Sequence, residues 1–151
     1  MLPAALGRRY DVAIRRLQEA DGDVESLPLP VQTLLRVEAA QSIIESGGLA
    51  FFYDADFPGQ PPYTVFVEAY RRIGADEAAD CIEAASMLFP FEEPQLFEPL
   101  RQLLLERFVA DPRHPFARLS ARLDQDLGVW TCLMRYVDDH AEAFAPGSAA
   151  R

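Results

Sequence analysis

Apolar residues recur at intervals of three and four along most of this 151-residue chain, and glycine or proline repeatedly interrupts the pattern. This spacing places the apolar side chains on one face of an α-helix. No stretch has the clean alternation of apolar and polar residues that is typical of a half-buried strand. We therefore predict an all-α fold, a compact single-domain bundle of about seven helices over residues 1–145, with a disordered tail at 146–151.

The individual helices follow from their apolar faces and from the residues that end them. We expect helices over residues 4–20, 30–46, 62–73, 77–89, 96–108, 116–127 and 129–144, with a short helix over 49–53. Asp76 is expected to cap the fourth of the long helices with its side chain. The next helix is marked by Leu96, Leu100, Leu103, Leu104 and Phe108.

Three glycines are expected to end helices. Gly47 and Gly48 follow the second helix, and Gly74 follows the third. Glycine has no Cβ, so it adopts the left-handed conformation that commonly closes a helix without steric strain. This role explains the glycine pair fully, and no phosphate-binding loop is predicted there, because the chain contains no lysine and hence no Walker motif.

Negative charge is concentrated in the middle of the chain. The net charge is −10, and residues 21–100 hold fifteen acidic residues against three arginines, a balance of −12. Nucleic acids and anionic membranes attract positively charged proteins, so direct binding of this acidic chain to either is not expected. Binding to a cationic partner is compatible with its charge. Charge alone supports two interpretations, a solvated surface that keeps the protein soluble and an acidic docking face.

No catalytic motif is present in the sequence. The serines lack a nucleophile elbow, and Cys81 and Cys132 form no CxxC pair and have no histidine nearby. We expect both thiols to be reduced, and we expect no enzyme activity, no cofactor and no metal. The opening residues are too short and too soon charged for a signal peptide, and no apolar run spans a bilayer, so we expect a cytoplasmic protein.

One alternative places chemistry near the end of the chain. His114 lies in a proline-rich turn, and His140 lies on an apolar helical face where a packed imidazole is the commoner role. If the last two helices form an antiparallel hairpin, several acids could converge with His140 and hold a hard cation. A metal-dependent or hydrolytic enzyme using the Asp124–His140 region therefore stays open, with the candidate groups Asp124, Asp126, Asp138, Asp139 and His140.

An aromatic group follows the glycine pair, and we interpret it as mainly core. Its members are Phe51, Phe52, Tyr53, Phe57, Tyr63 and Phe66. Large aromatic side chains are buried far more often than they form ligand cages. If part of this group is exposed, it would serve as a dimer or partner interface with Asp54 and Asp56 at its rim.

The segment IIESGGLAFFYDAD, residues 43–56, resembles the DUF4375 family of small bacterial proteins, which includes a DNA-mimic protein. Further points agree in order, and they are RIGA at 72–75, MLFP at 87–90, LD at 123–124 and RYVDDH at 135–140, so the resemblance covers about residues 28–145. The family-like residues with structural roles are Gly47, Gly48, Phe51, Phe52 and Gly74. Three amide positions of the family differ, with Ser46, Ala50 and Asp54 in their place.

The resemblance implies an all-helical fold, dimerisation and, as in the DNA-mimic member, an acidic surface that occupies the DNA-binding face of a transcription factor. Carboxylates spaced along a surface can present negative charge to a basic protein much as phosphates do. The carboxylates we expect to bind such a basic partner are Asp54, Asp56, Asp76, Glu77, Asp80, Glu83, Glu92 and Glu93. An immunity-like or antitoxin-like protein that neutralises a basic partner shares these electrostatics and is the other open alternative.

Overall fold

The computed structural model describes residues 1–146 and is all-helical over that range, without a strand. The predicted fold class is therefore confirmed, whereas the predicted tail, apart from residue 146, lies outside the described residues. The α-helices are α1 Gly7–Glu19, α2 Leu29–Asp54, α3 Thr64–Arg72, α4 Asp76–Ser86, α5 Glu98–Ala110, α6 Pro115–Leu123 and α7 Val129–Asp139. Short 3₁₀ turns occupy Ala4–Leu6, Val24–Ser26, Pro94–Leu96 and Ala141–Phe144.

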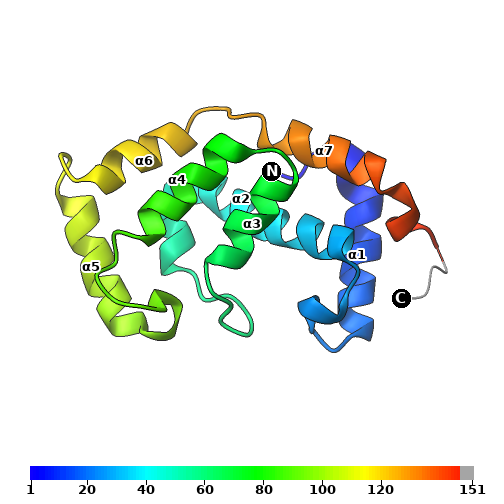
Figure 1. The fold of residues 1–151 in the computed structure, drawn as a ribbon, viewed down its shortest axis with the longest axis horizontal. Helices are drawn as coiled ribbons and strands as arrows, with labels where there is room; N and C mark the ends of the chain where they lie inside the picture. Colours follow the sequence, from blue (N-terminus) through cyan, green and yellow to red (C-terminus); the bar gives the residue numbers. More distant parts are fainter. Residues whose placement is uncertain (147–151) are drawn as a thin grey trace.

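Helix α2 forms the centre of the molecule. It packs against α1, α3, α5, α6 and α7, while α4 packs between α3 and α6. Figure 1 shows α1 and α5 at the two ends of an elongated body, with α6 and α7 following one another along one long edge. The first part of α2 carries a fully buried stripe at the expected helical spacing, made of Val31, Leu34, Val37 and Ala40.

The glycine pair breaks α2 into two parts. Gly47 has φ −154° and ψ 17°, and Gly48 has φ 77° and ψ −173°, so neither residue is helical. The backbone of Gly48 lies in a region that is essentially restricted to glycine. The prediction that the first part ends at the glycines and that a short helix follows is confirmed, and Gly74, with φ 84°, ends α3 as expected.

Most of the aromatic group lies in the core, where residues from the second part of α2 pack against residues at the start of α3. Phe52 and Tyr53 are fully buried, and Tyr63 and Phe66 are nearly so, with ring centroids 4.9 to 5.6 Å apart in the contacts among these four side chains. The interpretation of the group as mainly core is therefore confirmed. Phe51 is the exception, because 58% of it is exposed.

Two boundaries of α4 differ from the prediction. Asp76 is the first residue of the helix rather than its cap, and Ala75 occupies the capping position without a side-chain hydrogen bond. The reason is the left-handed turn at Gly74, which brings the chain into the helix one residue earlier than the capping interpretation requires. The helix also ends at Ser86, before Pro90, so proline does not terminate it directly.

The apolar residues that mark α5 in the sequence are not all buried in the structure. Leu96, Leu100 and Leu103 are each about 45% exposed, whereas Arg101, Leu105 and Phe108 are buried. The side chain of Arg101 is only 1% exposed, and its Nη1 and Nη2 donate to acceptors inside the protein, whereas its buried Nε has no partner among the described residues. Apolar residues lie on both faces of this helix, and therefore their spacing alone could not identify the buried one.

Candidate functional site

The eight predicted partner-binding carboxylates are all exposed, but they fall into two groups. Asp76, Glu77, Asp80 and Glu83 lie on α4. Asp54 ends α2, Asp56 follows it in the connection to α3, and Glu92 and Glu93 lie in the connection between α4 and α5. The eight residues therefore do not form one row along a single element.

Two arginines pair with three of the four carboxylates in the α4 group. Arg71 pairs with Asp80 at 2.8 Å and with Glu83 at 3.3 Å, and hydrogen bonding to Asp80 raises the pKa of the Arg71 guanidinium. Arg122 on α6 donates from Nε to Oε1 of Glu77 at 2.6 Å. An opposite charge at each of these positions weakens the field that the α4 carboxylates present to a partner.

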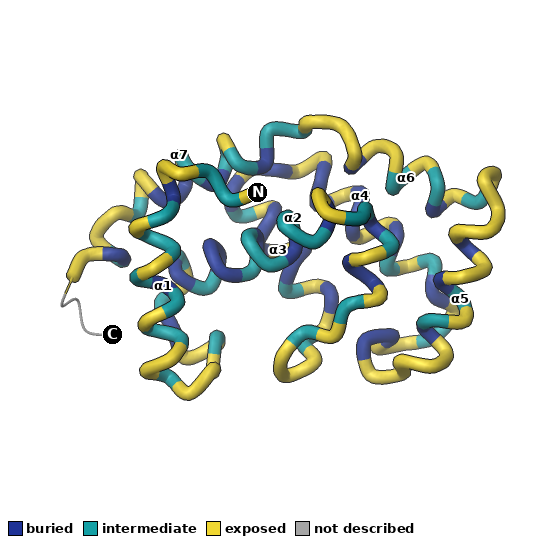
Figure 2. The backbone as a smooth tube through the Cα atoms, turned by 180° about the vertical axis from the view of Figure 1, so that it is seen from behind, coloured by how far each residue is buried: buried dark blue, intermediate teal, exposed yellow. Residues whose placement is uncertain are grey.

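The second group belongs to a longer acidic surface that only the tertiary structure reveals. The connections over residues 20–28, 55–63 and 87–97 all lie along the same long edge of the molecule, the lower edge in Figures 1 and 2. None of the three connections contains an arginine or lysine. We call this surface, together with the helix residues Asp54 and Glu98 that flank two of the connections, the acidic edge. Its carboxylates, all exposed, are Asp21, Asp23, Glu25, Asp54, Asp56, Glu92, Glu93 and Glu98.

The opposite long edge has no comparable excess. It is formed by α6, α7 and the connection between them (Figure 1). These segments contain the arginines Arg118, Arg122 and Arg135 beside the acids Asp124, Asp126, Asp138 and Asp139. Negative charge on the described residues is thus distributed unevenly between the two edges. The edge whose connections contain no basic residue is the one suited to a cationic partner, although Arg36 and Arg72 line a pocket beside Glu25.

Arg101 holds two connections of the acidic edge together. Its Nη1 donates to the carbonyl oxygens of Pro94 and Gln95 at 3.1 and 3.0 Å, and its Nη2 donates to Oδ1 of Asp56 at 3.0 Å. A guanidinium is rigid and planar, so it fixes the relative position of the groups that it bridges. The Arg101 charge partly neutralises the Asp56 carboxylate. Its bonds to Pro94 and Gln95 fix the backbone next to Glu92 and Glu93.

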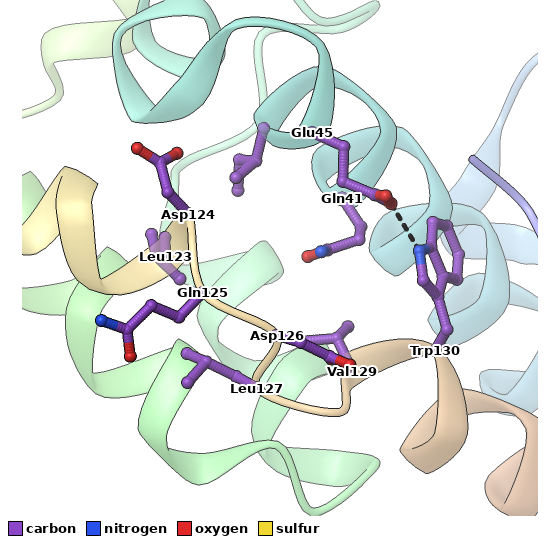
Figure 3. A pocket seen from close by; sticks show the side chains of 10 residues that line it. Gln41, Glu45, Leu123, Asp124, Gln125, Asp126, Leu127, Val129 and Trp130 are labelled. Atoms are coloured by element: carbon purple, nitrogen blue, oxygen red, sulfur yellow. Dashed lines mark hydrogen bonds between the residues drawn. The ribbon is translucent and has the colours of Figure 1, made fainter.

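A pocket of about 400 Å³ lies on the other side of α2, beneath the α6–α7 connection. In Figure 3, Gln41 and Glu45 of α2 lie across from residues 123–127, and Trp130 closes one side. No basic residue lines this pocket. Asp124 lies close to Gly48, so the structure brings together two points of the family resemblance that are far apart in the sequence.

Several polar groups of this pocket already have structural partners. The indole N–H of Trp130 donates to Glu45, and the amino group of Met1 also bonds to that carboxylate at 2.8 Å. Asp126 accepts from the backbone N–H of Gly128 at 2.8 Å, where α7 begins. The Trp130 bond attaches α7 to α2, and the Asp126 bond fixes the turn that begins α7, so Glu45 and Asp126 both have structural roles here.

The hairpin required by the enzyme alternative does not form. Helices α6 and α7 follow one another instead of lying antiparallel (Figure 1), so Asp124 and Asp126 are separated by the length of α7 from Asp138, Asp139 and His140. Asp138 instead pairs with Arg9 at 2.5 Å. Within residues 1–146, no three histidine, cysteine, aspartate or glutamate side chains are placed to hold a metal ion.

Both histidines have structural contacts. Nδ1 of His114 accepts from the backbone N–H of Phe116 at 3.1 Å and so caps α6, and its ring stacks on Phe108 at 4.4 Å. Nδ1 of His140 lies 2.7 Å from the carbonyl oxygen of Tyr136, one turn earlier in the chain. The helix cap made by His114 could have been suspected from its position just before Pro115.

These features define a class, a small all-helical protein with an acidic edge. A family model described as DMP19-like protein matches residues 25–140, and the chain belongs to that family. Searches of the curated proteins and of the solved structures gave no significant match. None of the described helices combines the length and the apolar character needed to cross a membrane.

The family match spans α2 to α7 and confirms the resemblance noted in the sequence. It includes two connections of the acidic edge, whereas Asp21 and Asp23 precede it. Sequence reasoning missed Asp21, Asp23, Glu25 and Glu98 as candidate site residues. The available signal was that each of three connections is acidic and free of basic residues, but their alignment depends on the fold.

Proposed function

We propose that this protein is a non-enzymatic acidic binding protein that acts as a DNA mimic and occupies the DNA-binding face of a basic transcription factor. Membership of the DMP19-like family supports this proposal. The observation that carries it is the acidic edge, in which three connections without a basic residue lie along one long edge of the molecule.

The physical basis is the potential in front of the edge. DNA attracts proteins through a row of phosphate charges, and binding is driven largely by the cations on the protein that meet them. Exposed carboxylates along an elongated edge present a row of negative charges to the same cations. Because Arg101 is buried behind this edge, its charge is not presented to a partner directly.

The test is a capture followed by competition with DNA. The immobilised protein is incubated with a cell lysate at about 0.05 M salt, and retained proteins are released at about 0.5 M, where screening limits charge interactions to a few ångströms. We expect release of a basic protein that binds duplex DNA. Adding this protein to the complex of the captured protein with DNA should displace the DNA in a mobility-shift assay.

Two triple variants of equal charge show whether the edge itself is responsible. Asp23→Asn, Glu92→Gln and Glu93→Gln neutralise the acidic edge, and Asp124→Asn, Asp139→Asn and Glu142→Gln are the matched control. We expect the first variant to lose DNA displacement at least tenfold more than the second, because local potential and not net charge decides binding.

Several outcomes contradict the proposal. If the captured protein does not bind DNA, the protein is a neutraliser of the immunity or antitoxin kind. If the captured protein holds DNA and this protein at once, the two do not share a surface. Equal loss in both triple variants would show that the acidic edge has no special role.

A further inference from the structure

A groove with an exposed aromatic wall lies between the end of α2 and α5. Its volume is about 550 Å³, and it is lined by Ala50, Phe51, Asp54, Gln102, Leu105, Glu106, Val109 and Ala110. Phe51 and Val109 are 58% and 57% exposed. Two apolar side chains, one from α2 and one from α5, are thus exposed to solvent in the same groove. Exposed apolar residues that lie together are typical of a surface that binds a partner.

The glycine pair positions the aromatic wall. A Cβ atom on Gly47 would overlap the ring of Phe51, so the ring lies directly against the backbone at the break in α2. Any other residue at position 47 would push this ring away from the helix or require the helix to shift. Gly47 therefore leaves the space in which the phenyl ring lies against the backbone and forms one wall of the groove.

The charges around the groove restrict what it can accept. Asp54 and Glu106 are the charged residues that line it, and no arginine is among the lining residues. Asp54 also belongs to the acidic edge, so the groove and the edge are continuous at this residue. An apolar ligand flanked by positive charge complements this surface, whereas an anionic ligand would be repelled.

We propose that this groove binds an apolar side chain from a basic segment of a partner protein, with neighbouring arginine or lysine residues meeting Asp54 and Glu106. The basic character of the partner rests on the proposed function, and the apolar anchor goes beyond it. Charge at an interface speeds and orients encounter, and an aromatic or apolar side chain buried in a pocket adds affinity to it. A DNA duplex offers no equivalent anchor, so the groove would let the protein outcompete DNA for the same partner.

The test uses two synthetic helical peptides with identical arginines, one with leucines on its apolar face and one with alanines. Each is titrated into ¹⁵N-labelled protein. We expect the leucine peptide to bind at least about tenfold more tightly and to shift the amide signals of Ala50, Phe51, Val109 and Ala110. The alanine peptide should shift mainly signals of the acidic edge.

Phe51→Ala should abolish the difference between the two peptides and leave binding of the alanine peptide unchanged. Leu100→Ala, on the outward face of α5, is the matched control and should preserve the difference. Both side chains are exposed, and therefore neither variant is expected to impair folding.

The inference is overturned if the two peptides bind equally, if neither binds, or if the leucine peptide shifts signals away from the groove. It is also overturned if sedimentation shows a dimer that Phe51→Ala converts to a monomer, because a second copy then covers the groove. The DNA competition above does not use these peptides. A failed competition with an intact leucine preference would reject the DNA-mimic proposal alone.

Discussion

Gly48 is the residue at which the backbone of α2 leaves the helical region. Its φ of 77° and ψ of −173° are strained for any residue with a side chain, and a Cβ there would lie 3.3 Å from Oγ of Ser120. We predict that Gly48→Ala lowers the free energy of unfolding by about 1–3 kcal/mol. Urea denaturation measures this change.

Gly7→Ala is the control for that variant. Gly7 begins α1 with a helical φ of −53°, and a Cβ on it would meet open space. This substitution should leave stability unchanged or raise it by up to about 1 kcal/mol. Equal effects of the two substitutions would contradict the assigned backbone conformation at Gly48.

Tyr63 and Tyr53 are buried tyrosines whose hydroxyl groups differ. Among the described residues, the Tyr63 hydroxyl has no hydrogen-bond partner, whereas the Tyr53 hydroxyl donates to the carbonyl oxygen of Ile82 at 2.9 Å and lies 2.7 Å from Oγ of Ser86. We predict that Tyr53→Phe costs about 1 kcal/mol of stability at neutral pH, and that Tyr63→Phe costs nothing or stabilises. A greater cost for Tyr63→Phe in thermal or urea unfolding would show that its hydroxyl is bonded.

Burial of Tyr63 predicts that the stability of the protein depends on pH in the alkaline range. Burial raises the pKa of Tyr63 to about 12, while the Arg101 charge opposes that rise. The unfolded chain ionises first, near the ordinary tyrosine value of about 10. Stability should therefore fall as pH increases from about 10 to about 12, and Tyr63→Phe should make that fall shallower. Urea midpoints over this range measure it, and an unchanged slope in Tyr63→Phe would refute the assignment.

Arg101 is the charged residue whose loss should cost most. Removing it takes the Arg101 donor from the carbonyl oxygens of Pro94 and Gln95, of which Pro94 keeps the backbone N–H of Phe97, and frees Asp56. We predict that Arg101→Met lowers the free energy of unfolding by about 3 kcal/mol. The exposed Arg107→Met should change it by less than about 0.5 kcal/mol. Similar urea midpoints for the two variants would contradict the bridging role.

At the scale of elements, α5 has two apolar faces with different roles. Leu105 is 6% exposed and Leu100 is 45% exposed. We predict that Leu105→Ala destabilises the protein by about 2–5 kcal/mol, because it removes buried contacts and leaves a cavity. Leu100→Ala should stay within about 0.5 kcal/mol of the native protein. A greater loss of thermal stability in Leu100→Ala than in Leu105→Ala would show that Leu100, and not Leu105, is buried in the core.

The element order shows where local signals suffice. The break in α2 was predictable because Gly47 and Gly48 decide the backbone conformation at their own positions. The start of α4 was not, because the turn at Gly74 moved the cap to Ala75. The inward face of α5 was not predictable either, because a buried arginine is favourable only where acceptors from distant segments meet it.

At the scale of the whole molecule, the acidic edge predicts charge behaviour that does not depend on a partner. The two triple variants described above change the net charge equally, but they remove carboxylates from different parts of the surface. Retention on an anion exchanger depends on clustered charge, so we expect the edge variant to elute at lower salt than its control. Identical elution would show that the charge is evenly spread.

The sequence by itself determined the all-helical fold, the helix breaks at glycine, the aromatic core and the excess of acid, because spacing and composition act locally or sum over the chain. It could not determine that α6 and α7 fail to form a hairpin, that Arg71 and Arg122 offset the α4 carboxylates, or that three acidic connections share one edge. These features depend on segments that are far apart in the chain. Only the packing of the helices around α2 decides which of these segments lie close together.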